Sequence, residues 1–211
     1  IVLHYLQQNQ RAAVLAVGLK ARPAGRTASS RYELEWQMDN PDGDALRYRL
    51  RFRAENQTVW RDMLRDSVVH TEPNYAWETA SLPDGYYIVE VEASDESANP
   101  RALQLTSRAV SEPIRIDNHA PVIEGLALQG ARVSGRAVDT LGPIARLELA
   151  IDGGEFHDVF PVDHLLDTAV ERFEVELEEL APGPHVVAVR ATDASGNSVT
   201  AEVEHSPSPR R

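Results

Sequence analysis

The sequence predicts an all-β chain of two consecutive seven-stranded antiparallel β-sandwiches. The first observation is an internal repeat: residues 82–99 (LPDGYYIVEVEASDESAN) align without a gap with residues 180–197 (LAPGPHVVAVRATDASGN), at an offset of 98 residues. This period is a whole domain, longer than the ~20–50-residue unit of a solenoid. The second observation is the alternation of apolar and polar residues, which is typical of half-buried strands. We therefore expect two copies of one kind of small β domain.

The first domain is expected to span residues 11–117, after a lead-in segment of residues 1–10 from a preceding domain. Its clearest strand follows residue 45, where Leu46, Tyr48, Leu50 and Phe52 alternate with four arginines. Only a strand places all four arginines, Arg47 to Arg53, on one face. The other expected strands are residues 12–19, 32–38, 57–63, 75–81, 87–93 and 107–116.

The second domain is expected to span residues 118–205, with a polar tail at residues 206–211. Residues 173–177 are expected to pair with residues 185–191, and Asp152-Gly153-Gly154 is typical of a hairpin turn. The stretch between Asp158 and Arg172 is the least strand-like, so we expect a long loop with one helical turn there. The remaining expected strands are residues 121–128, 131–138, 144–151 and 201–204.

The composition of the chain argues against several classes of function. The 211 residues carry a formal net charge of −12, whereas nucleic-acid binding requires a basic footprint. There is no cysteine, which excludes disulfides and thiolate metal sites. No apolar run approaches the ~20 residues that span a bilayer, so we expect no membrane insertion. The sequence also lacks G-x-S-x-G, H-E-x-x-H and a phosphate-binding loop, so we expect no enzymatic activity.

Several motifs resemble known sandwich families. Residues 82–95 resemble the sixth-strand region of fibronectin type III domains, in which a Leu, a Pro-Gly turn and a Tyr form a tyrosine corner; Tyr87 stands at the Tyr position. Trp36 resembles the core Trp on the second strand of that family. The pattern W-x-x-D-N-P-D-G-D-x-L-x-Y-x-L, from Trp36 to Leu50, resembles the fibronectin-like domain that follows β-propellers in large exported bacterial proteins.

The second domain resembles bacterial immunoglobulin-like domains. The likeness is carried by V-x-G-x-A-x-D (133–139), I-D-G-G (151–154) and R-A-T-D-A-S-G-N (190–197). His185 stands where a fibronectin type III domain has its corner Tyr. Both resemblances imply an extracytoplasmic location, secreted, periplasmic or on the cell surface, within a larger chain.

Acidic residues near strand ends are the candidate metal ligands. Carboxylate and carbonyl oxygens gathered at one end of a sandwich are the ligands that Ca²⁺ takes, in sets of 6–8. The alternative is that these residues form tight turns and cap the backbone, and we favour it. No other cofactor is expected. The calcium candidates are Asp39, Asp42, Asp44 and Asp95 in the first domain, and Asp117, Asp139 and Asp193, with Asn197, in the second.

Other side chains suggest weaker sites. Tyr86 and Trp60 are candidates for stacking on sugars, whereas Tyr75 and Trp77 have the alternation of core residues. The arginine row could bind a polyanion, but cross-strand pairing with Glu90 and Glu92 is the favoured interpretation. His157, Asp158, Asp163, His164 and Asp167 are acceptable metal ligands in a spacing that matches no standard site.

The sequence thus predicts a noncatalytic structural spacer or protein-interaction module of an exported multidomain protein. Its expected partners are other domains of the parent chain and, beyond them, a protein or a cell-surface polysaccharide. The alternatives are a carbohydrate- or surface-polymer-binding module appended to a secreted hydrolase, and a calcium-rigidified adhesin.

Overall fold

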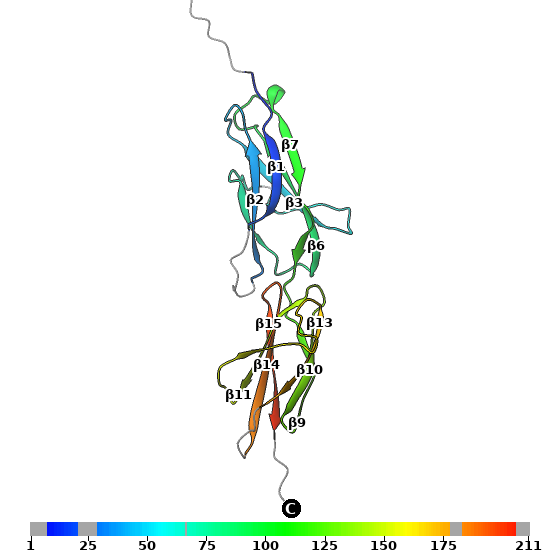
Figure 1. Cartoon of the computed structure of the whole chain (residues 1–211). Coiled ribbons are helices and arrows are strands. Elements are labelled where there is room, and N and C mark those ends of the chain that lie inside the picture. The colour runs from blue at the N-terminus through cyan, green and yellow to red at the C-terminus, as the bar shows by residue number, and fades with distance from the viewer. Residues whose placement is uncertain (1–7, 21–28, 66, 178–182, 206–211) are drawn as a thin grey trace, which may run out of the picture. The chain divides into compact units, whose positions relative to one another are not determined.

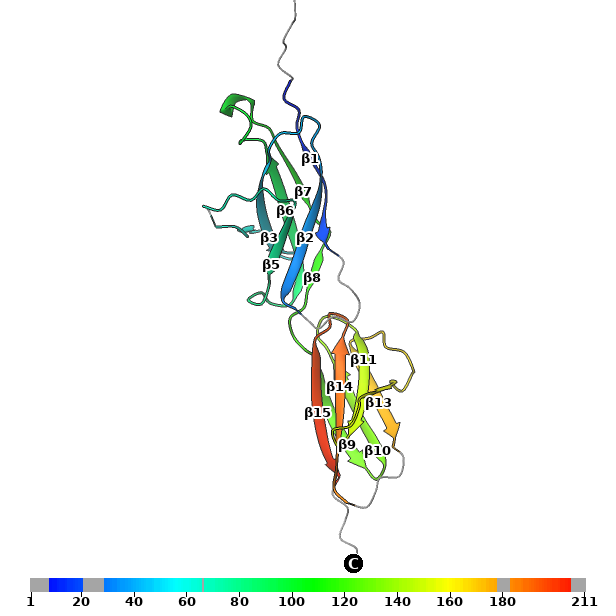
Figure 2. The ribbon, with the colours of Figure 1, turned by 90° about the vertical axis from the view of Figure 1, so that its left-hand side faces the viewer.

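A computed structural model describes residues 8–20, 29–65, 67–177 and 183–205 of the chain (Figures 1 and 2). It divides into two units, the first including Ser30–Ile116 with the strand before it, and the second beginning at Asp117. The expected tail and residues 1–7 of the expected lead-in lie outside the described residues. Within the described ranges, no helix is long and apolar enough to cross a bilayer.

Unit 1 is a sandwich of two antiparallel sheets. One sheet has the strand order β1-β2-β5, and the other has the order β4-β3-β6-β7, with β8 also paired to β6. A short 3-10 helix, η1 (Arg101–Leu103), precedes β7. The strands are β1 (Ala13–Leu19), β2 (Arg31–Asp39), β3 (Arg47–Ala54), β4 (Arg61–Asp62), β5 (Asn74–Glu78), β6 (Gly85–Ser94), β7 (Thr106–Val110) and β8 (Ile114–Ile116).

The core of unit 1 is aromatic. Alternate residues of β2 and β3 face it, as the period-two pattern predicts, and the Trp36 ring packs edge-on against Tyr48 at a centroid distance of 5.0 Å. Trp77 packs on Phe52 at 5.2 Å. Leu50, which is fully buried, pairs with Val91 of β6, so aliphatic side chains complete this core.

Two strand predictions for unit 1 are wrong in detail. The expected strand 107–116 is two strands, because Ser111 interrupts the ladder: its amide donates to Val89 O (2.8 Å) and its hydroxyl accepts from Val89 N (3.0 Å). Pro113 follows and has no N–H to offer the ladder. The expected strand 57–63 shrinks to the two residues of β4. The described part of unit 1 therefore has eight strands, not seven.

Unit 2 repeats the strand order of unit 1. Its two antiparallel sheets have the orders β13-β10-β9 and β12-β11-β14-β15, which correspond to β5-β2-β1 and β4-β3-β6-β7. The described part of this unit has the predicted seven strands. The strands are β9 (Val122–Gln129), β10 (Arg132–Val138), β11 (Ile144–Ile151), β12 (His157–Val159), β13 (Val170–Glu176), β14 (His185–Asp193) and β15 (Ser198–His205).

The predicted pairing of residues 173–177 with residues 185–191 is wrong. β13 pairs with β10, whereas β14 pairs with β11 and β15, so β13 and β14 belong to opposite sheets. The expected helical turn before residue 172 is also absent: the described chain has loop and bridge there, and β13 already begins at Val170.

One glycine is essential to the core of unit 2. Gly135 of β10 pairs with Phe173 of β13, and a Cβ at residue 135 would lie 2.7 Å from the Cζ atom of the Phe173 ring. Phe173 is 2% exposed and fills the space that the missing side chain leaves. The core of unit 2 is therefore aliphatic around one phenyl ring.

Candidate functional site

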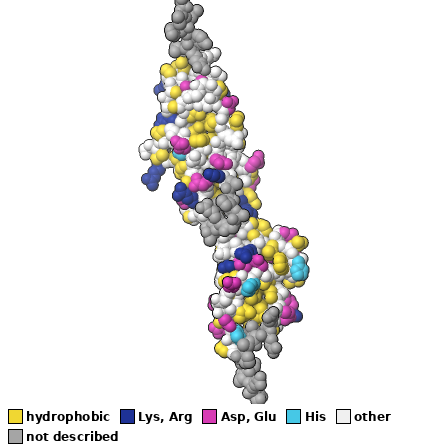
Figure 3. Space-filling view, turned by 60° about the vertical axis from the view of Figure 1, so that its left-hand side comes forward, with side chains coloured by type: hydrophobic (Ala, Val, Ile, Leu, Met, Phe, Trp, Pro, Cys, Tyr) yellow, Lys and Arg dark blue, Asp and Glu magenta, His cyan; other side chains and the backbone are white. Residues whose placement is uncertain are grey.

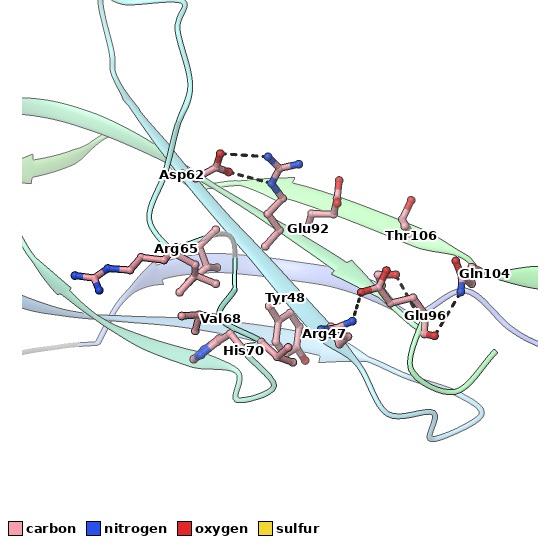
Figure 4. Close-up of a pocket in the computed structure, with 15 residues that line it drawn as sticks. Arg47, Tyr48, Asp62, Arg65, Val68, His70, Glu92, Glu96, Gln104 and Thr106 are labelled. Atoms are coloured by element: carbon pink, nitrogen blue, oxygen red, sulfur yellow. Dashed lines mark hydrogen bonds and ion pairs between the residues drawn. The ribbon is translucent and has the colours of Figure 1, made fainter. Parts of the chain in front are cut away.

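The first candidate site is a concavity of about 440 Å³ on unit 1 (Figure 4). Residues of β3 and β6 line it together with the chain from Asp62 to His70 and with Gln104 and Thr106. His70 forms a β-bridge with Tyr48, which holds the chain at His70 against β3. Val68 and Val69 are about half exposed, at 50% and 54%, so the lining is partly apolar.

Most charged groups of this concavity are paired, and exposed Arg65 is the exception among the described lining residues. Arg49 donates from Nε and Nη2 to the two carboxylate oxygens of Asp62, at 3.0 and 3.2 Å. These hydrogen bonds lower the pKa of Asp62 below its usual value. Arg47 donates to Glu96 at 2.6 Å (Figure 4). The concavity thus presents salt-bridged groups, with little net charge to attract an ion.

The arginine row of β3 is engaged throughout. Arg51 forms an ion pair with Glu90, which confirms the cross-strand interpretation at that position. Glu92 lies opposite Arg49 but pairs with Arg108 of β7. Arg53 donates to the carbonyl oxygens of residues 54, 55 and 57. Three of these arginines pair with carboxylates and the fourth, Arg53, keeps its charge but is bonded to carbonyls, so the row gives little support to polyanion binding.

The two aromatic candidates differ. The guanidinium carbons of Arg51 and Arg53 lie 5.8 and 5.2 Å from the ring centroid of Trp60, a cation–π arrangement that covers a half-buried ring. Tyr86 is 44% exposed and lines a second concavity of about 440 Å³. That concavity is otherwise mostly polar, and its side chains include those of Glu55, Asn56, Gln57, Arg61 and Asp84.

The three residues expected to be structural lie in the cores or at turns. Trp36 is 4% exposed and Tyr87 is 3% exposed. Tyr87 donates its hydroxyl to Pro83 O at 2.7 Å, the bond that a tyrosine corner requires. His185 Nδ1 lies 2.6 Å from Asp152 Oδ2 on the facing hairpin turn. The residues equivalent to the Pro83 turn lie outside the described part of unit 2.

Three of the four acidic candidates of unit 1 accept hydrogen bonds from backbone or side-chain amides. Asp95 accepts from Leu105 N and from Asn9 Nδ2, both at 2.8 Å. Asp42 accepts the amide of Gln10, Asp44 accepts an amide hydrogen of Asn99, and Asp39 is exposed at the end of β2. Among the described residues, these four carboxylates do not form a group of metal-ligand spacing.

Three acidic candidates of unit 2 do come together. Atoms of Asp117, Asp139 and Asp193 lie within 4.8 Å of one another, and all three residues are at most 8% exposed. Asp139 follows β10, Asp193 ends β14, and Asp117 precedes β9, so one end of the sandwich gathers them. Their positions at predicted strand ends already place these residues together as calcium candidates.

Hydrogen bonds within unit 2 occupy many of the carboxylate oxygens of this cluster. Asp139 Oδ1 accepts the amides of residues 141 and 142 at 2.8 Å. Asp193 accepts the amides of residues 195 and 197 and the Asn197 side chain, which also donates to Asp117 O at 3.2 Å. Ca²⁺ requires 6–8 oxygens, and the cluster alone does not specify a cation. Calcium binding stays a prediction that thermal unfolding in EDTA and in CaCl₂ can test.

Two buried acids were missed. Glu171, 2% exposed, accepts the amides of Asp167 and Thr168 at 3.2 and 2.8 Å. Glu171 lies two residues before Phe173, so strand alternation predicts that both side chains face inward. Glu148, also 2% exposed, accepts two hydrogen bonds of 2.7 Å from Arg190. Among the described residues, the His157–Asp167 segment holds no group of metal-ligand spacing.

No protein-family model and no curated protein matches the chain. Among solved structures, the FN1-FN3 domains of chicken CNTN1 align over 93% of this chain and 68% of that chain, with 16% identity and a TM-score of 0.36. Tp47, the 47-kilodalton lipoprotein of Treponema pallidum, aligns with 14% identity and a TM-score of 0.32, over 93% of this chain and 52% of that one. The chain thus spans about half of the Treponema protein. Neither likeness assigns a function.

Proposed function

We propose that the chain is a noncatalytic spacer and protein-interaction module of an exported multidomain protein. The supporting observation is how its reactive side chains are used. Asp95, Asp139 and Asp193 accept backbone amides, and the arginines of β3 are hydrogen-bonded or ion-paired. Side chains committed in this way stabilise turns and sheets, which is a structural rather than a catalytic use.

The mechanism is geometric. Ile116 is the last residue of β8, and the next residue, Asp117, is held within unit 2 by Ser195 Oγ (2.9 Å) and by Asn197 Nδ2. A junction with so little free chain limits hinge motion more than a Gly/Ser linker does. Two sandwiches joined in this way would set a distance between the domains that flank them.

Distances between spin labels test this proposal. The chain has no cysteine, so Leu15→Cys in unit 1 and Glu202→Cys in unit 2 give two labels without background. Both positions are exposed. We expect a single narrow distance distribution, which broadens when Asp117→Gly removes the anchor of the junction. A broad distribution in the unmodified background would contradict the spacer proposal.

A carbohydrate-binding module is the second candidate, and Tyr86 is the observation that favours it. Its exposed ring stands at a concavity with amide and carboxylate side chains, the combination that stacks on a sugar and hydrogen-bonds its hydroxyls. Retardation of the chain in gels that contain soluble polysaccharides tests it. Binding should disappear in Tyr86→Ala and persist in the control Leu15→Ala; equal migration in all gels contradicts this candidate.

A further inference from the structure

Unit 2 exposes an unusual group of large apolar side chains between β12 and β13. Phe160, Val162 and Leu165 are 60%, 64% and 60% exposed, and they lie within six residues of one another. We call these three the apolar loop patch. Single exposed apolar residues are ordinary, but a group of them on one loop indicates an interaction site. Figure 3 shows hydrophobic side chains interspersed with acidic ones on the described surface.

The loop that carries the patch is held in place. Val162 N donates to Arg172 O at 2.8 Å, beside the bridge between Pro161 and Phe173. His164 closes a tight turn by donating its amide to Pro161 O at 2.9 Å, with a left-handed φ of 63°.

The far end of the loop is fixed by buried Glu171. Its carboxylate accepts the amides of Asp167 and Thr168 and the Thr168 hydroxyl, the last two at 2.8 Å. Leu166, next to the patch, packs against the core. The three apolar side chains therefore stand on an ordered base, and ordering costs little on binding.

The surroundings of the patch are acidic. Residues 155–171 include five acidic residues and no Lys or Arg, although Glu171 is buried and Asp158 pairs with Arg146. Asp163 and Asp167 are exposed, and neither forms an ion pair with a described residue. Arg172 is the adjacent base. An acidic rim attracts a basic partner and repels an anionic lipid surface.

We propose that the apolar loop patch binds a protein segment that combines apolar side chains with Lys or Arg. This inference rests on the proposed function, because it names the contact surface of the interaction module. Apolar contacts at the centre would supply affinity, and Asp163 and Asp167 would select for positive charge at the edge.

Selection from a random peptide library tests the proposal, with the immobilised full chain as bait and the triple variant Phe160→Ser, Val162→Ser, Leu165→Ser for counter-selection. We expect enriched peptides that contain apolar residues flanked by Lys or Arg. A synthetic copy of such a peptide should bind at least tenfold more weakly to the triple variant. It should also bind more weakly to Asp163→Asn, Asp167→Asn and in higher salt.

The matched control is Leu103→Ser with Val110→Ser in unit 1, where both side chains are 58% exposed; it should bind as the parent chain does. Peptides that bind the triple variant equally well, or that carry no basic residue, overturn the proposal. If the chain sediments with phosphatidylcholine or phosphatidylserine vesicles, the patch binds a membrane and the proposal is overturned. If the chain dimerises and the triple variant does not, the patch binds a second copy and the proposal is likewise overturned. If the peptide experiment fails but the spin-label distance distribution is narrow, the proposed spacer function still stands.

Discussion

Replacing Gly135 with alanine tests how closely the core of unit 2 is packed. Without a clash, Gly→Ala in a strand should stabilise the protein by about 0.4–1 kcal/mol, because it restricts the unfolded chain. Here the new Cβ would lie 2.7 Å from Phe173 Cζ and 3.3 Å from both Cε atoms. The ring is buried and cannot turn into solvent, so overpacking should cost about 1–3 kcal/mol. We therefore expect a net destabilisation of about 1–2 kcal/mol, opposite in sign to the simple expectation.

The chain allows this change to be measured on unit 2 alone. All three tryptophans, Trp36, Trp60 and Trp77, lie in unit 1. Urea unfolding followed by tryptophan fluorescence therefore reports unit 1, while far-UV circular dichroism reports both units. Gly135→Ala should move the dichroism transition of unit 2 and leave the fluorescence transition unchanged.

Gly18 of β1 is the matched control, because a Cβ there meets nothing within 4 Å. Gly18→Ala should be neutral or stabilising. Shortening the ring with Phe173→Leu should make Gly135→Ala less costly, a coupling that a double-mutant cycle measures. Stabilisation of unit 2 by Gly135→Ala, or costs that simply add in the cycle, would refute the packing argument.

Three further changes test individual hydrogen bonds. Tyr87→Phe leaves the Pro83 carbonyl without its hydroxyl donor and should destabilise unit 1 by about 1–2 kcal/mol; unchanged fluorescence-monitored unfolding would contradict a corner role. Asp193→Ala leaves two amides unpaired and should cost unit 2 about 2–4 kcal/mol in urea unfolding monitored by dichroism, a loss that near-neutral behaviour would disprove. The hydrogen bond from Val186 N, together with one from His185, lowers the pKa of Asp152. The stabilisation by the ionised Asp152 carboxylate should be present above pH ~4, the usual pKa of an Asp in the unfolded chain. It should disappear as the pH falls through the lower pKa that Asp152 has in the folded protein. Asp152→Asn should flatten this dependence in thermal melts between pH 2 and 6, and an unchanged slope would exclude the bond as its source.

The strands were predictable where alternation is strict. The arginines of β3 share one face only in a strand, and residues 144–151 were expected as a strand and form β11. Sheet membership was not predictable for β13, because alternation tells which side chains face inward but not which neighbour supplies the hydrogen bonds. The break at Ser111 depends on a side-chain bond to Val89 from 22 residues away, which no local pattern reveals.

The candidate site was predictable in part. The repeat offset and the positions of strand ends brought Asp117, Asp139 and Asp193 into one hypothesis, although up to 76 residues separate them in the sequence. For the segment that carries the apolar loop patch, the sequence predicts a long loop with acceptable metal ligands, and it does not predict that Phe160 is exposed. Solvent exposure is a property of the folded surface, and a loop without periodicity does not encode it.

The unlike cores of the two units have a consequence for folding. Sandwiches of the same strand order in one chain can exchange equivalent strands as they emerge from synthesis, a common route to misassembly. At matching places β2 carries Tyr32, Leu34 and Trp36, whereas β10 carries Val133, Gly135 and Ala137. A β10 strand placed in unit 1 would leave large voids, and β2 in unit 2 would collide with Phe173. Differing side-chain volume thus keeps each half of the chain from capturing a strand of the other.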